Sequence, residues 1–167
     1  ISLVPTMLSR FLDHRGPRAA PAGLQVLLLG GAAAAPELLA RARFAGYPVC
    51  PTYGLTEATS QVATARPQRP GAARPAPMHP LSGVEVRILV EGEAAAAGQP
   101  GEIVVGGPTV MQGYLGDPAA TALSLRDGWL HTGDIGFLDD AGGLHVLDRR
   151  DDLIVSGGEN VYPAEGE

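Results

Sequence analysis

The sequence contains no lysine: its 12 basic residues are all arginine and face 18 acidic residues, for a formal net charge of −6. This balance excludes a protein whose main task is to bind a nucleic-acid backbone, because such proteins present a basic face. A single cysteine, Cys50, excludes an intramolecular disulfide framework and any zinc site built from several cysteines. The 45% of apolar residues in a chain of 167 is still enough to form a hydrophobic core.

The sequence also lacks a membrane-spanning segment and a recognisable signal peptide. Its longest apolar run, residues 26–35, is interrupted by Gly30 and Gly31 and is far shorter than the ~18–20 residues that cross a bilayer. The first residue is Ile1 and not methionine. We therefore expect a cytoplasmic chain without a membrane span that is part of a longer protein. The sequence does not determine an oligomeric state.

The first 66 residues have the pattern of an α/β unit. Apolar residues recur at helical spacing over 2–12, and the continuous apolar run at 24–29 is typical of a buried parallel strand. Residues 36–45 predict a second helix with a proline in its first turn, and 49–53 predict the next strand. A right-handed crossover between the two strands makes them parallel.

The second half has the pattern of antiparallel β structure. Five prolines between residues 66 and 80 indicate a linker or boundary loop. Beyond it, short strands are predicted at 84–90, 103–105, 129–138 and 144–147, with a hairpin turn at 139–143 and a surface loop at 91–100. The predicted fold class is α/β plus β. Residues 1–66 end an α/β (βαβ) subdomain, and residues 67–148 form a small antiparallel barrel or curled sheet.

Residues 52–57 (TYGLTE) form the first candidate site, because they follow the second predicted parallel strand. Ligands of open α/β sheets bind beyond the carboxyl ends of strands, where Gly30 and Gly31 should also lie. A hydroxyl at Thr56 beside the carboxylate of Glu57 can hold a phosphate together with its Mg²⁺. The alternative is that Thr56 caps a helix while Glu57 interacts with the helix dipole.

Further candidates have weaker signals. Asp134, in a Thr-Gly-Asp sequence, is either a turn former or a ligand-binding carboxylate. The charged run 148–152 is typical of a solvated surface, and the glycine pair in Ser156-Gly157-Gly158 does not have the spacing of a P-loop. The four histidines have no metal-ligand spacing, so we expect ordinary surface histidines. Cys50 should be a small buried apolar residue.

Several motifs, taken in order, resemble those of the adenylate-forming enzymes, which include acyl-CoA synthetases, peptide-synthetase adenylation domains and luciferases. The resemblance covers nearly the whole chain. The segments that carry it are 30–32, 53–57, 101–103, 113–114, 129–134 and 148–154. Residues 53–61 (YGLTEATSQ) and 156–165 (SGGENVYPAE) are most similar to the members that activate o-succinylbenzoate in menaquinone biosynthesis, while other aryl-CoA ligases share the SGGEN segment.

The resemblance implies a two-step reaction that uses ATP, Mg²⁺ and coenzyme A. A small carboxylic acid attacks the α-phosphate of ATP to give an acyl-adenylate and pyrophosphate, and the CoA thiol then displaces AMP. The nucleotide-binding residues that the resemblance implies are Gly30, Gly31, Ala32, Tyr53, Gly54, Thr56, Asp134 and Arg149.

The same resemblance implies individual roles for some of these residues. Thr56 and Glu57 are the implied catalytic residues: Thr56 hydrogen-bonds the α-phosphate, and Glu57 is the metal ligand that binds Mg²⁺. Tyr53 stacks on the adenine. Asp134 accepts hydrogen bonds from the ribose hydroxyls, assisted by Arg149.

Residues 149–167 are implied to form a hinge and the start of a small C-terminal domain. Asp151 is the implied hinge of the rotation between two catalytic states, and Ser156, Gly157 and Gly158 border the CoA channel. The family's phosphate loop and adenylation lysine would lie before residue 1 and beyond residue 167, so we expect the chain alone to be inactive. The alternatives are another aryl- or fatty-acyl-CoA synthetase, and a non-catalytic nucleotide-binding remnant.

Overall fold

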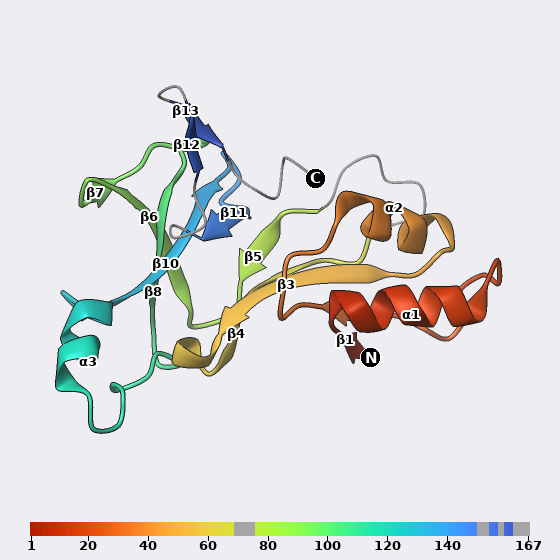
Figure 1. Cartoon of the computed structure of the whole chain (residues 1–167), viewed down its shortest axis with the longest axis horizontal. Helices are drawn as coiled ribbons and strands as arrows, with labels where there is room; N and C mark the ends of the chain where they lie inside the picture. The colour runs from red at the N-terminus through yellow and green to blue at the C-terminus, as the bar shows by residue number, and fades with distance from the viewer. Residues whose placement is uncertain (69–75, 150–153, 157–158, 162–167) are drawn as a thin grey trace.

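The computed structural model describes residues 1–68, 76–149, 154–156 and 159–161. Among them, eleven strands form one mixed sheet in the order β1-β2-β3-β4-β5-β11-β10-β8-β6-β7, with β9 paired to β10 (Figure 1). The strands are β1 (Ser2–Leu3), β2 (Leu27–Leu29), β3 (Val49–Leu55), β4 (Ser60–Ala65), β5 (Met78–Pro80), β6 (Glu85–Val90), β7 (Glu93–Ala94), β8 (Gly101–Gly106), β9 (Leu125–Arg126), β10 (Trp129–Leu138) and β11 (Leu144–Arg149). A separate two-stranded sheet contains β12 (Ile154–Ser156) and β13 (Glu159–Val161). The helices are α1 (Pro5–Arg15), α2 (Pro36–Phe44), α3 (Pro118–Ser124) and the 3₁₀ turn η1 (Thr56–Ala58).

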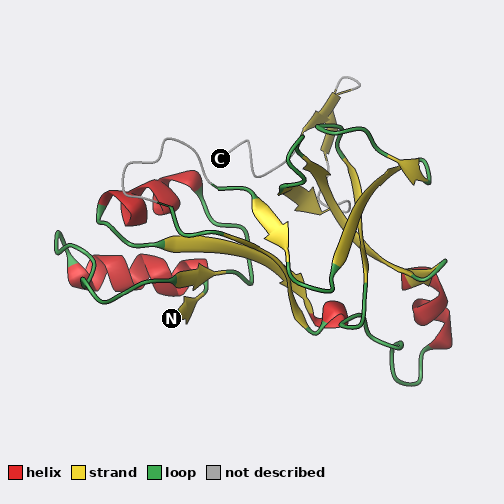
Figure 2. Cartoon of the chain, turned by 180° about the vertical axis from the view of Figure 1, so that it is seen from behind, coloured by secondary structure: helices red, strands yellow, loops and turns green. Residues whose placement is uncertain are grey.

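The first part of the chain is the predicted α/β unit. Strands β1, β2 and β3 are parallel, and α1 and α2 connect them. Each helix begins with a proline, whose missing N–H would have no intrahelical partner in the first turn. Both helices pack on β2 and β3 in a core that contains Leu8, Leu12, Leu27, Leu39 and Val49. Figure 2 shows α1 and α2 at the opposite end of the molecule from α3.

The second part is the predicted antiparallel β structure. Its central strand β10 pairs with both β8 and β11, and β8 pairs in turn with β6. A second core joins buried residues of five strands, among them Val62, Ile88, Ile103, Leu130 and Leu144. Among the described residues the sheet is open, because β1 and β7 at its two ends do not pair with each other. The prediction of α/β plus antiparallel β structure is confirmed, and the β part is an open sheet and not a closed barrel.

Strand β3 belongs to both parts. Its first three residues pair parallel with β2, at Leu27↔Val49, Leu28↔Cys50 and Leu29↔Pro51. Its later residues pair antiparallel with β4, from Thr52↔Thr64 to Leu55↔Ser60. One strand therefore ends the α/β unit and starts the antiparallel sheet without a linker between them.

Local structure differs from the sequence prediction at several points. Residues 2–3 form the edge strand β1, because parallel pairing with β2 holds the residues before Pro5 extended. The first helix therefore begins at Pro5, and it continues to Arg15. The proline-rich segment contains β5, and the predicted loop at 91–100 contains β7. Strand β4 and helix α3 were not predicted. None of the described helices is long and apolar enough to cross a bilayer.

The β10–β11 hairpin is closed by hydrogen bonds to one carboxylate. Oδ1 of Asp139 accepts from the backbone N–H groups of Ala141 (3.0 Å) and Gly143 (2.7 Å), and Oδ2 lies 3.1 Å from Nε2 of His145. The ring of His145 stacks on Phe137 with a centroid separation of 4.6 Å. The hydrogen bond from His145, followed by those from the two backbone groups, lowers the pKa of Asp139 below its usual value.

This carboxylate makes the stability of the hairpin depend on pH. Because the folded-state pKa of Asp139 is lowered, the stabilisation is present above the unfolded pKa of about 3.9 and is lost as the pH falls through the folded value. We expect Asp139→Asn to lower the urea midpoint near neutral pH, with a difference from the wild type that shrinks in acid below about pH 4. The control is Asp140→Asn at the neighbouring exposed residue. A difference that stays constant on acidification would contradict a role for the ionised carboxylate.

Candidate functional site

The turn that follows β3 encloses the first candidate site. Strand β3 leads directly into η1, and Thr59 ends η1 in the left-handed conformation, with φ of 60°. The chain then reverses into β4, so that residues of both strands surround an open cavity of about 580 Å³. The cavity is lined by Gly31, Thr52, Gly54, Leu55, Thr56, Thr59, Ser60 and Gln61. Gly31 follows β2, so the cavity lies at the carboxyl ends of two parallel strands, as the sequence predicts.

Two glycines make this arrangement possible because neighbouring atoms occupy the space that a side chain would need. A Cβ on Gly54 would overlap the carbonyl oxygen of Ser60 across the β3–β4 pair. A Cβ on Gly30 would overlap Oγ1 of Thr52. The β2–β3 and β3–β4 contacts beside the cavity therefore depend on residues without a side chain.

The structure joins two of the predicted site residues directly. The hydroxyl of Tyr53 in β3 donates a hydrogen bond of 2.6 Å to Oδ2 of Asp134 in β10, although the two are 81 residues apart. Asp134 is only 7% exposed, and burying a polar side chain is costly unless it is hydrogen-bonded. The bond holds the hydroxyl end of the Tyr53 side chain.

Asp134 lies at an irregularity of β10. His131 pairs with Val104 of β8 and Ile135 pairs with Glu102, so β10 has extra residues between these two pairs. Gly133 there has φ of 73°, and the Thr132 hydroxyl accepts from the backbone N–H of Asp134 (3.1 Å) while donating to the carbonyl of Ile103 (2.8 Å). Such bulges redirect a side chain. Asp134 is thus a buried strand residue and not an exposed turn former.

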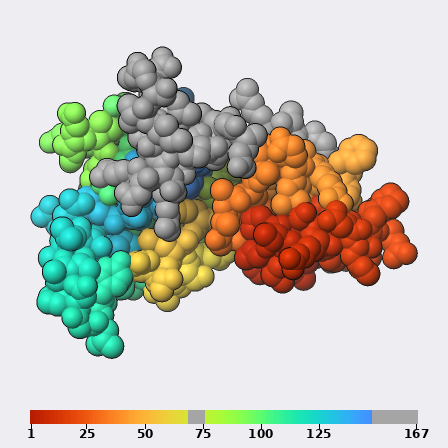
Figure 3. Space-filling view, in the orientation of Figure 1, coloured from red at the N-terminus to blue at the C-terminus, as the bar shows by residue number. Residues whose placement is uncertain are grey.

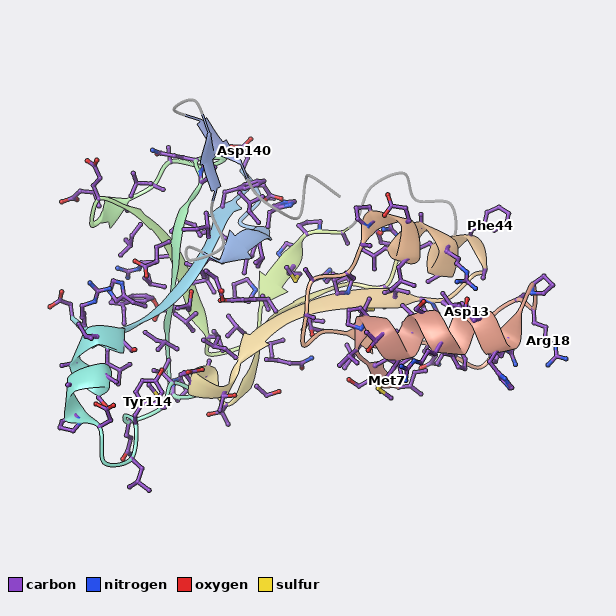
Figure 4. The ribbon with its side chains drawn as sticks, in the orientation of Figure 1. Met7, Asp13, Arg18, Phe44, Tyr114 and Asp140 are labelled. Atoms are coloured by element: carbon purple, nitrogen blue, oxygen red, sulfur yellow. The ribbon has the colours of Figure 1, made fainter. Side chains whose placement is uncertain are left out.

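Glu57 has a partner that the sequence interpretation did not include. The hydroxyl of Tyr114 donates to Oε1 of Glu57 at 2.8 Å (Tyr114 is labelled in Figure 4). This hydrogen bond to the Glu57 carboxylate is the main reason why the pKa of the Tyr114 hydroxyl is raised. Thr56 does not cap η1, because the N-cap residue is Leu55 and it makes no side-chain hydrogen bond, so the predicted capping alternative is wrong for Thr56. Glu57 does lie in the first turn of η1.

The structure describes some of the remaining predicted site residues and not others. Ala32 is exposed in the segment after β2. The backbone of Arg149 pairs with that of Asp134 at the end of β11, and Ser156 ends β12. Asp151, Gly157 and Gly158 lie outside the described residues.

The histidine prediction is wrong for His131. Its side chain is only 13% exposed, and Nδ1 lies 3.2 Å from Oε2 of Glu102 on the neighbouring strand β8. No spacing in the sequence indicates this pair, because strand pairing alone brings the two residues together. Cys50 is buried as expected, and burial raises the pKa of its thiol.

This combination of fold and site can be compared with known proteins. The AMP-binding enzyme family matches residues 1–115 of the chain. The chain belongs to the AMP-binding enzyme family.

Curated relatives and solved structures of this family cover the chain from end to end. The 2-succinylbenzoate–CoA ligase of Geobacillus sp. (strain WCH70) is 47% identical over 167 residues, which is 100% of this chain and 34% of that protein. The o-succinylbenzoate coenzyme A synthetase of Bacillus subtilis, solved with AMP, is 43% identical with a TM-score of 0.85 over 99% of this chain and 34% of that one. The same synthetase has been solved with ATP and a magnesium ion.

A more distant structure has the same fold with a different name. The amide bond synthetase McbA of Marinactinospora thermotolerans is 35% identical with a TM-score of 0.86, over 99% of this chain and 34% of that one. The chain thus spans about a third of the length of the curated relatives that it matches.

The side chains near the cavity fit a magnesium ion only if a bound phosphate supplies further oxygen ligands. Across the described residues, no three His, Cys, Asp or Glu side chains gather closely enough to hold a metal ion. Glu57 contributes one carboxylate beside Thr56, which lines the cavity. Mg²⁺ is commonly bound by one or two carboxylates plus phosphate oxygens, and this donor set fits that case.

The overlap at Gly54 gives a direct test of how the cavity is built. We expect Gly54→Ala to destabilise the chain by about 1–3 kcal/mol, because the new methyl group must displace the backbone of Ser60. The measurement is the free energy of urea unfolding. Gly23→Ala is the matched control, since a Cβ there meets no atom within 4 Å. Equal stability of the two variants would contradict the close approach of β3 and β4.

Proposed function

We propose that the protein carrying this chain is an ATP-dependent, AMP-forming acid–CoA ligase that activates o-succinylbenzoate. The observation that carries the proposal is 43–48% identity, over 99–100% of the chain, to several 2-succinylbenzoate–CoA ligases. The Tyr53–Asp134 hydrogen bond supports it, because it joins two of the family-like motifs that are 81 residues apart in the sequence. The proposed compartment is the cytoplasm, where ATP and CoA are available.

The proposed reaction has two half-reactions at one nucleotide site. The acid carboxylate attacks the α-phosphate of ATP, forming the acyl–phosphate bond and breaking the bond to pyrophosphate. The CoA thiol then attacks the acyl carbon, and AMP leaves. The metal would neutralise charge on the phosphate oxygens. Thr56 lines the cavity, and its hydroxyl would donate a hydrogen bond to the α-phosphate. Glu57 would be the metal ligand.

The nucleoside would be held on the other side of this turn. Gly30, Gly31 and Ala32 would flank the adenine and the acyl group, and the ring of Tyr53 would stack on the adenine while its hydroxyl is held by Asp134. A carboxylate accepts up to about four hydrogen bonds, so Asp134 can accept from ribose hydroxyls as well as from Tyr53. Arg149, paired with Asp134 through the backbone, would assist.

The domain organisation belongs to the same proposal. Residues 1–66 and 67–148 would be two subdomains of a large AMP-binding domain, and 149–167 would connect it to a small domain. Asp151 would be the hinge between the adenylation and thioester-forming states. Ser156, Gly157 and Gly158 would border the channel through which CoA reaches the adenylate.

The test is a substrate panel on the full-length protein. We expect pyrophosphate exchange that depends on o-succinylbenzoate, and formation of its CoA thioester, to exceed those with other aromatic and fatty acids. Pyrophosphate exchange that depends on a different acid would support the ligase activity and change the proposed substrate. ATP binding without pyrophosphate exchange or thioester formation for any acid would favour the non-catalytic nucleotide-binding alternative. We expect the 167-residue chain assayed alone to show no exchange.

A substitution separates nucleotide binding from CoA binding. We expect Asp134→Asn in the full-length protein to raise the KM for ATP about ten- to a hundredfold, because one charge-assisted hydrogen bond contributes about 1.5–3 kcal/mol. The KM for CoA should change little. Asparagine keeps an oxygen that accepts from Tyr53, so the fold is retained.

The control for this substitution is Asp13→Asn on α1, where an exposed carboxylate pairs with Arg41 far from the cavity. Unchanged ATP kinetics in Asp134→Asn would remove Asp134 from the nucleotide site.

A further inference from the structure

A second segment of the chain is tied to the turn that contains Glu57. The backbone N–H of Met111 donates to the carbonyl of Glu57 (2.7 Å), and the Thr59 hydroxyl donates to the carbonyl of Thr109 (2.6 Å). The Tyr114 hydroxyl adds the contact to the Glu57 carboxylate (2.8 Å). Figure 3 shows the surface of this later segment (teal) against that of the β3–β4 turn (gold). Three hydrogen bonds thus fasten residues 109–114 to residues 57–59.

Tyr114 is itself held at its backbone. Its N–H donates to Oγ1 of Thr121 in α3 (2.9 Å), and that hydroxyl donates to the carbonyl of Asp117, the N-cap residue of the helix (2.8 Å). Gly113 has φ of 150°, and a Cβ there would lie 2.8 Å from the Thr121 methyl group. The phenol therefore extends toward Glu57 from a backbone that α3 keeps in place.

The contact restricts a side chain that would otherwise be mobile. Glu57 is partly exposed, and its three rotatable bonds allow many positions of the carboxylate. A hydrogen bond to one carboxylate oxygen selects among these positions and leaves the second oxygen to point elsewhere. Tyr114 has no role in the proposed reaction described above.

We propose that Tyr114 is a positioning residue that holds Oε1 of Glu57 so that the carboxylate is preset for the cation of a metal–nucleotide ligand. This proposal rests on the proposed function, which makes Glu57 the metal ligand. The segment between β8 and α3 would then increase the affinity for a metal–nucleotide ligand. It would do so through the hydrogen bond from the Tyr114 phenol to Glu57, without contacting the reacting atoms.

The test compares two variants that each lose one phenolic hydroxyl. Tyr114→Phe loses the bond to Glu57, whereas the control Tyr47→Phe loses only the bond from Arg15, in the other core. In the full-length protein, the readout is Mn²⁺ binding in the presence of a non-hydrolysable ATP analogue, followed by electron paramagnetic resonance. We expect Tyr114→Phe to weaken Mn²⁺ binding about five- to tenfold, which is less than the full effect of a hydrogen bond to a charged group because the lost bond orients Glu57 and does not contact the metal. Tyr47→Phe should leave Mn²⁺ binding unchanged.

A second pair of variants acts on the support of Tyr114. Thr121→Val removes the acceptor of the Tyr114 N–H, whereas Thr121→Ser retains a hydroxyl there. We expect the valine variant to weaken Mn²⁺ binding in the same direction and the serine variant to bind like the wild type. Urea unfolding, followed by far-ultraviolet circular dichroism, verifies that each variant is folded.

The outcomes distinguish this proposal from the one on which it rests. Wild-type affinity for Mn²⁺ in Tyr114→Phe would overturn the positioning role and leave the ligase assignment intact. Equal weakening of analogue binding with and without metal would also overturn it, because that result indicates a structural role only. A wild-type protein that binds no metal–nucleotide would overturn both.

Discussion

The arrangement of the molecule depends on one strand, β3, which takes part in two kinds of pairing. Its first residues are bonded to β2 in parallel and its last residues to β4 in antiparallel orientation. The change occurs between Pro51 and Thr52, immediately before the sequence that turns into η1. Because the strand is continuous, it connects the two cores directly beside the cavity. The glycines at 30 and 54 allow the close strand contacts that this requires.

The site is then completed by two segments that arrive from far along the sequence. The bulge in β10 brings Asp134 to Tyr53, and the segment after β8 brings Tyr114 to Glu57. Both contacts use a tyrosine hydroxyl that donates to a carboxylate. All basic residues of the chain are arginines, but the donors to Asp134 and Glu57 are the neutral phenols of Tyr53 and Tyr114. We propose that these two carboxylates bind a nucleotide and its metal. Neutral donors orient a carboxylate without cancelling its charge, which leaves that charge for a cation or for hydroxyl groups.

Prediction from sequence was accurate wherever the local pattern and the tertiary environment agree. The α2 helix, the long strand β10 and the hairpin at Asp139 follow from periodicity, proline position and turn residues. Prediction was incomplete where pairing with a distant segment determines the local structure. Ser2 and Leu3 match a helical pattern, but they are extended because they pair with β2. Helix α3 has the Asp-Pro start of a capped helix, and this signal was available in the sequence at Asp117.

The sequence by itself determined the family-like motifs and their order, and from them the residues that we propose for a nucleotide site. It did so because each motif is a short contiguous segment that can be read without knowing which distant segment packs against it. Only the tertiary structure decided that Asp134 is a buried strand residue joined to Tyr53, that His131 pairs with Glu102, and that Tyr114 holds Glu57. These pairs join residues 29 to 81 positions apart, and their contact depends on strand register and bulges, which are set by packing over the whole sheet.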